Sequence, residues 1–115
     1  MEEMQESEIP QERQQTQETE SAEPVRREGN TIYVGKKNPM AYVLSVVTMF
    51  NQGAPEVRLK ARGMSISRAV DVNQITRNRF IPTLQNKQIS LTTENLTRED
   101  GTPSRVSSIE IVMTK

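Results

Sequence analysis

The sequence predicts a small α/β protein: a two-layer βαβαββ sandwich, with two helices on one face of a four-stranded mixed sheet and a long hairpin arm. Three observations lead to this class. Polar and apolar residues alternate in several short segments, an apolar segment is bracketed by helix start and stop signals, and an Asp-Gly turn joins the last two strands. The length of 115 residues allows one domain at most.

The first strand and the first helix follow each other closely. Residues 31–35 alternate between apolar and more polar side chains, which is typical of a strand. Asn38 and Pro39 mark a helix start, because Asn caps the first amides and Pro fits the first helical position. We expect this helix to reach residue 51 or 52, where Gly53 stops it.

A second strand and helix come next. Residues 56–62 alternate strictly between charged and apolar side chains, which predicts a strand with one solvated face. The second helix is expected from about residue 65 to residue 79, before Pro82. Two strand–helix units favour parallel strands with right-handed crossovers, so both helices should cover the same face of the sheet.

The last two strands, residues 87–96 and 104–114, predict an antiparallel hairpin. Strands of about ten residues reach roughly 30 Å, and the distal part is polar, so we expect an arm. Arg98 and Arg105 near its end could enter a minor groove, which is about 6 Å wide. Arg105 is the better candidate because two acids occupy the turn; an ordinary solvated hairpin is the alternative.

Composition excludes several classes of protein. The chain has no Cys, His or Trp, which excludes a disulfide framework, a zinc finger, a Cys nucleophile and a Ser-His-Asp triad. The carboxylates form no pair at helical spacing, so we expect no enzyme, no cofactor and no metal. No apolar stretch is long enough for a membrane span, and the acidic N-terminus is unlike a secretory signal. We therefore expect a cytoplasmic protein.

The net charge of zero hides a division of the chain. Residues 1–28 hold nine acids and three bases, a net charge of −6, whereas residues 29–115 hold six acids and twelve bases, a net charge of +6. We expect residues 1–28 to form a disordered acidic tail and residues 29–115 to form the domain. The tail is either a solubilising segment or one that lies on the basic body and competes with an anionic ligand.

The predicted topology gathers cations at one edge of the sheet. The carboxyl ends of two parallel strands meet there, and each opens a helix whose amides and partial positive charge attract phosphate. The candidate nucleic-acid-binding side chains near this edge come from separate segments: Lys36, Lys37, Arg58, Lys60, Arg62 and Arg68. The alternative is a solvated charged face. The scarcity of aromatic residues favours recognition of a duplex backbone over single strands.

Two features bear on protein partners. Apolar residues of the first helix span more than half of its circumference, which exceeds the stripe that one sheet face needs. The surplus predicts a homodimer; the alternative is a well-buried helix. Phe80 follows a polar run at the end of the second helix, where it either caps the core or anchors a neighbouring molecule.

An ordered set of motifs across residues 29–114 resembles the Alba family of archaeal chromatin proteins. The motifs include Gly-Lys-Lys at 35–37, Asn-Gln-Gly at 51–53, Lys-Ala-Arg-Gly at 60–63, Arg-Asn-Arg-Phe at 77–80 and Ser-Arg-Val-Ser at 104–107. The resemblance implies a fold similar to the C-terminal domain of a bacterial translation initiation factor. It also implies a homodimer that binds duplex DNA, and often RNA, with little sequence preference.

The resemblance also assigns roles to residues. It places Lys36, Lys37, Lys60 and Arg62 on the backbone, the hairpins toward the minor groove, and Phe80 between neighbouring dimers. Two features depart from the family pattern: the long acidic tail, and Met64-Ser65 where Arg and Ala are common.

These observations predict a sequence-nonspecific, double-stranded DNA-binding chromatin protein that coats, bridges and compacts DNA as a dimer. It would be associated with the chromosome, with dimers side by side on DNA, and Lys36 and Lys37 are candidates for acetylation. One alternative is an RNA-binding protein that protects RNA or belongs to an RNA-processing particle. Another is a protein-interaction adaptor that uses the acidic tail.

Overall fold

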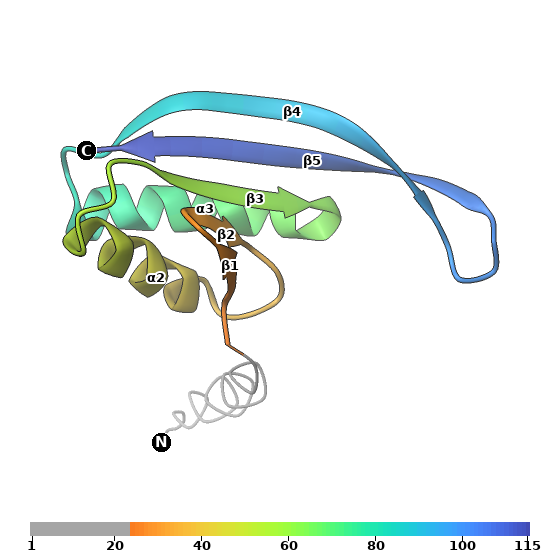
Figure 1. The fold of residues 1–115 in the computed structure, drawn as a ribbon, viewed down its shortest axis with the longest axis horizontal. Helices are drawn as coiled ribbons and strands as arrows, with labels where there is room; N and C mark the ends of the chain where they lie inside the picture. Colours follow the sequence, from red (N-terminus) through yellow and green to blue (C-terminus); the bar gives the residue numbers. More distant parts are fainter. Residues whose placement is uncertain (1–23) are drawn as a thin grey trace, which may run out of the picture.

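The computed structural model describes residues 24–115, which form one mixed five-stranded sheet with two helices on one side (Figure 1). Along the chain the elements are β1 Arg26–Glu28, β2 Thr31–Tyr33, α2 Pro39–Asn51, β3 Val57–Arg62, α3 Ile66–Ile75, β4 Gln85–Thr97 and β5 Pro103–Thr114. Their order across the sheet is β1-β2-β3-β5-β4. The mixed α/β class predicted from the sequence is therefore correct.

The strand directions follow the expected crossover. β2 and β3 are parallel and joined by α2, whereas β3 pairs antiparallel with β5, and β5 pairs antiparallel with β4. The carboxyl ends of β2 and β3 consequently lie at the same edge of the sheet, where α2 and α3 begin. This arrangement confirms the edge that the sequence predicted.

The sheet has one strand more than the four that the sequence predicted. The added strand, β1, lies within the segment 1–28 that we expected to be a tail, and it pairs antiparallel with β2 through a turn at Gly29 and Asn30. Gly29 has a φ of 56°, a conformation that glycine adopts without steric cost. All three residues of β1 are exposed and charged, so no alternation of apolar and polar residues predicted this strand. The rest of the predicted tail, residues 1–23, lies outside the described residues.

The capping residues of α2 act as predicted. The side chain of Asn38 accepts a hydrogen bond of 2.9 Å from the amide of Met40, and Pro39 is the first helical residue. Gly53, with a φ of 97°, follows the last turn. The helix runs from Pro39 to Asn51, close to its predicted bounds.

The second helix is less regular than predicted. The segment 65–79 was expected to be one helix, but α3 is preceded by a 3-10 turn, Gly63–Ser65, and ends in a π-helical turn, Thr76–Phe80. The buried hydroxyl of Thr76 donates to the carbonyl of Val72 at 2.7 Å, and Ile81 N donates to Thr76 O at 2.8 Å. The Val72 carbonyl thus accepts from both the hydroxyl and the amide of Thr76, and the bond from Ile81 N, five residues after Thr76, closes the π-helical turn.

The core lies between the helices and the covered face of the sheet. Ile32 on β2, Leu59 on β3 and Met113 on β5 are fully buried, together with Val43 and Val46 of α2. On β3 buried and exposed residues alternate strictly, so its charged side chains project from the opposite, uncovered face. The fold thereby holds a rigid strand whose cations face solvent.

The β4–β5 hairpin extends well beyond the body as an arm (Figure 1). Its turn is closed by a hydrogen bond of 2.9 Å from Arg98 N to Thr102 O, and Asp100 accepts from the amide and the hydroxyl of Thr102. These hydrogen bonds lower the pKa of the Asp100 carboxyl below its ordinary value. The long arm that the sequence predicted is thus present.

Candidate nucleic-acid interface

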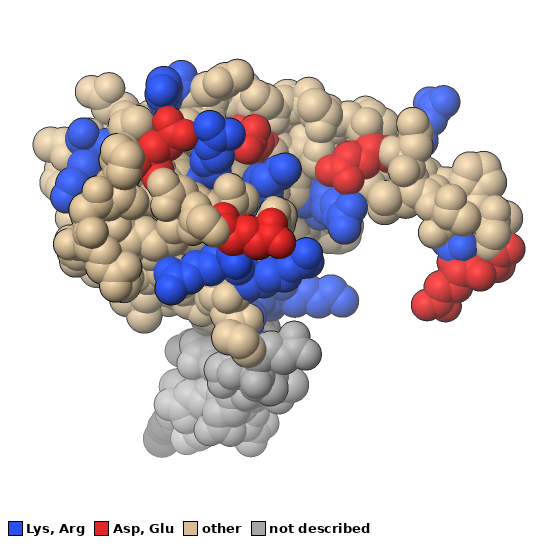
Figure 2. Space-filling view, viewed as in Figure 1, with Lys and Arg blue, Asp and Glu red and all other residues tan. Residues whose placement is uncertain are grey.

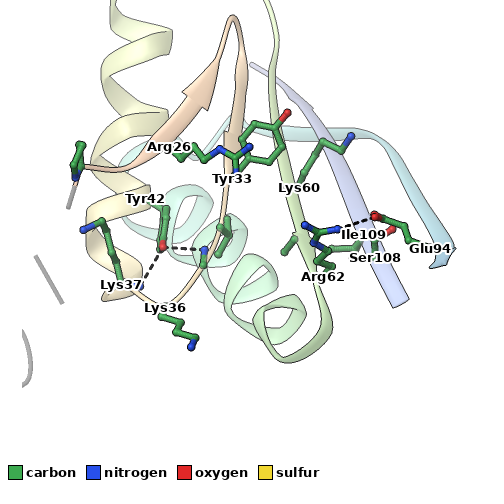
Figure 3. A pocket seen from close by; sticks show the side chains of 14 residues that line it. Arg26, Tyr33, Lys36, Lys37, Tyr42, Lys60, Arg62, Glu94, Ser108 and Ile109 are labelled. Atoms are coloured by element: carbon green, nitrogen blue, oxygen red, sulfur yellow. Dashed lines mark hydrogen bonds and ion pairs between the residues drawn. The ribbon is translucent and has the colours of Figure 1, made fainter. Parts of the chain in front are cut away.

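A cleft of about 530 Å³ opens at the sheet edge where β2 and β3 end (Figure 3). Five cationic side chains line it: Arg26, Lys36, Lys37, Lys60 and Arg62. Among the described residues in its wall, Glu94 is the one acidic side chain. We call this feature, with these six side chains, the basic cleft.

Parallel pairing of β2 and β3 brings distant cations to the basic cleft. Tyr33 pairs with Lys60 across the two strands, and the amide of Val34 donates to the carbonyl of Lys60 at 2.8 Å. The chain leaving β2 carries Lys36 and Lys37, so this pairing sets both lysines beside the end of β3. Figure 2 shows Lys and Arg side chains gathered on this side of the molecule.

Tyr42 and Arg68 hold the loop that carries the two lysines. The buried hydroxyl oxygen of Tyr42 accepts hydrogen bonds from the amides of Gly35 at 2.8 Å and Lys37 at 3.1 Å. Arg68 Nη1 donates to the carbonyl of Gly35 at 2.8 Å. Arg68 was predicted to bind nucleic acid directly; it does not line the basic cleft, and its guanidinium instead ties α3 to this loop.

These contacts correct one part of the sequence prediction, namely that helix amides offer a phosphate site at the start of α2. Pro39 has no N–H, the amide of Met40 donates to the Asn38 side chain, and the amide of Ala41 donates to the Asn38 carbonyl. The amides of Gly35 and Lys37 are engaged by Tyr42. Attraction of anions at this edge therefore depends mainly on cationic side chains.

Arg26 is a cleft residue that the sequence reasoning missed. Its guanidinium carbon lies 4.8 Å from the centre of the Tyr33 ring, a cation–π geometry. The Tyr33 hydroxyl donates to Glu28 at 3.0 Å, and this hydrogen bond raises the pKa of the phenol above its ordinary value. The Gly-Asn pair at 29–30 is a hairpin signal that would have placed Arg26 beside the basic cleft.

Acidic partners offset some of the predicted cations. Arg62 Nη1 lies 2.9 Å from Glu94 Oε1 at the basic cleft, an ion pair between exposed groups that joins β3 to β4. Arg58 lies outside the basic cleft, where it contacts Glu56 at 2.9 Å and Glu110 at 3.4 Å. Arg58 is therefore on the predicted face of the sheet but is neutralised by its neighbours.

Lys87 extends this second group of charges, since its ammonium lies 3.4 Å from Glu56. Hydrogen bonds from Arg58 and Lys87 lower the pKa of the Glu56 carboxyl, with the Arg58 bond the largest cause. The same bond to Glu56 raises the pKa of Arg58. These residues tie the start of β3 to the neighbouring strands.

The remaining predicted residues lie away from the basic cleft. Arg105 is exposed on β5 and pairs with Asn95 of β4, and Arg98 begins the turn at the tip of the arm. Acidic side chains also gather at that tip (Figure 2). Phe80 ends the π-helical turn with 42% of its surface exposed, so it does not cap the core.

Several apolar side chains on the helix side of the molecule are exposed. Ile89 and Leu91 of β4 share the sheet face of their partners Ile111 and Ile109, yet they are 54% and 74% exposed. Leu44 of α2, an apolar residue of the helix predicted to have a second buried face, is 56% exposed. The sheet face beside the helices is thus left partly uncovered in a single chain.

Two observations on the described residues concern metal ions and membranes. Within residues 24–115 no group of three acidic side chains could hold a metal ion. None of the described helices is long and apolar enough to cross a membrane. A small α/β domain with a basic cleft at one sheet edge and a long arm presents a positively charged surface that attracts anions.

Comparisons with known proteins agree on the family. The Alba family model matches residues 30–93. DNA/RNA-binding protein Alba 1 of Archaeoglobus fulgidus is 52% identical over 86 residues, covering 75% of this chain and 96% of the relative. DNA/RNA-binding protein Alba of Thermoplasma acidophilum is 53% identical over 88 residues, covering 76% of this chain and 98% of the relative. The chain belongs to the Alba family.

Solved structures show the same likeness. Alba from Thermoplasma volcanium superposes with a TM-score of 0.71 at 53% identity, covering 75% of this chain and all of that structure. ALBA1 from Trypanosoma brucei superposes with a TM-score of 0.59 at 26% identity, covering 77% of this chain and 72% of that one. The family resemblance inferred from the sequence motifs is therefore confirmed.

Proposed function

We propose that this protein binds nucleic acids through their phosphate backbone, without sequence preference, and that it coats, bridges and compacts duplex DNA on the chromosome. The observation that carries the proposal is the basic cleft, in which five cations from three separate segments face one acid. Lys and Arg neutralise phosphates and release condensed counterions, which supplies affinity without reading bases. The names of the relatives, DNA/RNA-binding proteins, support the same function.

We propose a homodimer as the binding unit. The apolar side chains left exposed on the helix side provide the surface: Leu44, Val70, Ile89 and Leu91. The helices contact β2 and β3 and leave the adjoining face of β4 open, which a second copy would cover. A dimer would present two basic clefts and two arms to one duplex, so each binding event would neutralise more phosphates.

The arm and Phe80 have secondary roles in this proposal. Arg105 on the exposed arm would follow the minor groove, while the acids at the tip keep the tip itself from deep insertion. Phe80, which is exposed at the end of the π-helical turn, would contact a neighbouring dimer on the same DNA. Side-by-side contacts of this kind lead to continuous coating.

Acetylation of Lys36 or Lys37 would regulate the same interaction. Acetylation removes the charge of a lysine, and both lysines line the basic cleft. Protein acetylated at either lysine should bind duplex DNA more weakly than unmodified protein. Equal affinities of the two forms would reject this role.

RNA is the second candidate partner, in RNA protection or an RNA-processing particle. Tyr33 lines the basic cleft among the cations, where an aromatic ring offers a stacking surface that backbone binding to duplex DNA does not require. The relatives' names also include RNA. Parallel titrations with duplex DNA, duplex RNA and folded RNA separate the two candidates.

A salt titration tests the proposed function. If a dimer neutralises about six to ten phosphates, affinity for duplex DNA should fall about 10³–10⁵-fold between roughly 50 and 200 mM salt. Duplexes of unrelated sequence should give the same affinity. A salt-insensitive complex, or one that selects a sequence, would contradict the proposal.

A further inference from the structure

The described chain begins at the basic cleft itself. Pro24, the first described residue, forms part of the wall of the cleft, and Arg26 follows on β1. The 23 residues that precede Pro24 in the sequence are therefore tethered at the edge of the cleft. Any affinity between that segment and the cleft acts within one molecule, without a search through solution.

The charges of the two parts are complementary. Residues 1–23 contain eight glutamates and one arginine, a net charge of −7. The basic cleft holds five cations and Glu94, a net charge of +4. Opposite net charges attract at distances within about one Debye length, roughly 10 Å at 0.1 M salt, and the segment joins the described chain at Pro24, in the wall of the cleft.

Other acidic groups of the molecule are less suited to the cleft. Glu99 and Asp100 lie in the turn at the far end of the arm, and acidic side chains are seen there in Figure 2. Glu56 and Glu110 are engaged with Arg58. Among the acids outside the cleft wall, those of residues 1–23 combine high density with attachment at its edge.

We propose that residues 1–23 bind the basic cleft of their own chain and compete with polyanions for it. The contact itself is independent of what the cleft binds; only the competition rests on the proposed function. Covalent attachment at the edge of the cleft gives an effective concentration in the mM range. If the segment binds about as weakly as a nonspecific polyanion, near 10⁻⁴ M, it should lower the affinity for nucleic acid about tenfold at low salt.

The first experiment measures the contact without nucleic acid. The full chain and a full-length variant with the eight glutamates of residues 1–23 changed to glutamine are treated with an amine-acetylating reagent, and each lysine is followed by mass spectrometry. Lys36 and Lys60 report on the cleft, while Lys87 and Lys115 are internal references outside its wall. The cleft lysines should react about tenfold more slowly in the unmodified sequence at low salt.

Salt and protein concentration sharpen this result. At high salt, about 0.5 M, Lys36 and Lys60 should be acetylated at the same rate in the two proteins, because screening removes the attraction. Equal rates in the two proteins at low salt would overturn the proposal. Protection that grows with protein concentration would overturn it too, because the occupant would then be the segment of another copy.

The second experiment measures competition and uses matched variants that each remove one acid. Glu23→Gln lies in the proposed segment, whereas Asp71→Asn removes an exposed acid of α3 outside the cleft wall. Glu23→Gln should tighten duplex DNA binding about twofold at low salt and steepen its salt dependence, whereas Asp71→Asn should change the affinity less. Equal effects of the two variants would assign the gain to net charge and overturn the competition.

The two experiments separate the inference from the proposed function. Slower acetylation of cleft lysines together with no binding of DNA or RNA by any variant would uphold the contact and refute nucleic-acid binding. Equal acetylation rates together with salt-dependent DNA binding would refute the contact and leave the proposed function standing.

Discussion

Glu94 is the residue whose charge most directly opposes the basic cleft. It contacts Arg62 at 2.9 Å, and a phosphate that approaches Arg62 must displace or share this partner. The pair joins β3 to β4, which are separated in the sheet by β5, so sequence spacing alone gave no sign of it. At this scale, electrostatic partners depend on strand register, whereas four of the five cations of the basic cleft could be predicted from the sequence.

Replacing Glu94 with glutamine should tighten binding of duplex DNA about two- to fivefold at low salt, because Arg62 loses a competing carboxylate and an exposed ion pair is worth about 1 kcal/mol or less. Fluorescence anisotropy at several salt concentrations measures the change. Asp71→Asn, which removes an exposed acid of α3 outside the cleft wall, is the matched control. Equal tightening by both variants would show that net charge, not Arg62, is responsible.

Tyr42 is the residue that shapes the lysine loop. Tyr42→Phe leaves the amides of Gly35 and Lys37 without their buried acceptor, which should lower the free energy of unfolding by about 1–3 kcal/mol. DNA affinity should fall as well, because Lys36 and Lys37 are then held less rigidly. Thermal unfolding and anisotropy measure the two effects. Tyr33→Phe, which loses only an exposed hydrogen bond to Glu28, should lower the free energy of unfolding by less than Tyr42→Phe does. A larger loss in Tyr33→Phe than in Tyr42→Phe would refute the role of Tyr42.

At the scale of elements, local chemistry predicted most of the fold. Asn38, Pro39 and Gly53 marked α2, and the alternation of residues 57–62 marked β3. The sequence pattern did not predict β1, because its three charged residues form a strand only through pairing with β2. The π-helical end of α3 is closed by the bond from Ile81 N to Thr76 O, which no periodicity of the sequence reveals.

The start of β3 should show a pH-dependent stability. The pKa of Glu56 is lower in the folded protein than its ordinary value of 4.5, so the stabilisation is present above that value and is lost as the pH falls through the lower folded pKa. The melting temperature of Glu56→Gln should therefore be below that of the wild type at pH 7 and converge with it once the pH falls below the lowered pKa of Glu56. Glu99→Gln serves as a control that should show a smaller difference at pH 7. A difference in melting temperature between Glu56→Gln and the wild type that persists in acid would contradict the stabilising role of the Glu56 carboxylate.

At the scale of the whole molecule, the proposed dimer depends on the uncovered apolar face and would bring two basic clefts to one duplex. Leu91→Lys should shift a dimer toward monomer, because a buried unpaired ammonium is costly at an interface. Sedimentation velocity measures the mass. Met64→Lys, at a residue that is 97% exposed on the 3-10 turn before α3, adds the same charge elsewhere and should leave the dimer intact. A monomeric wild type, or dissociation by both variants, would reject the proposed interface.

Charge at the whole-molecule scale could be predicted from the sequence only in outline. The sequence revealed an acidic N-terminal part and a basic body of equal and opposite charge. It could not show that the chain enters the body at Pro24, in the wall of the basic cleft, because that position depends on β1. The three-dimensional arrangement therefore joins the acidic N-terminal part to the edge of the basic cleft, which is the basis of the proposed competition.

The most direct test of the central claim compares the salt dependence of DNA binding in the wild type and in Lys36→Ala with Lys37→Ala. Each lost phosphate contact should lower the slope of log K against log salt by about 0.9, so two lysines per chain should lower it by about 1.8 per bound chain. The loss of affinity should be equal for unrelated sequences. An unchanged slope would show that the basic cleft does not contact the phosphate backbone.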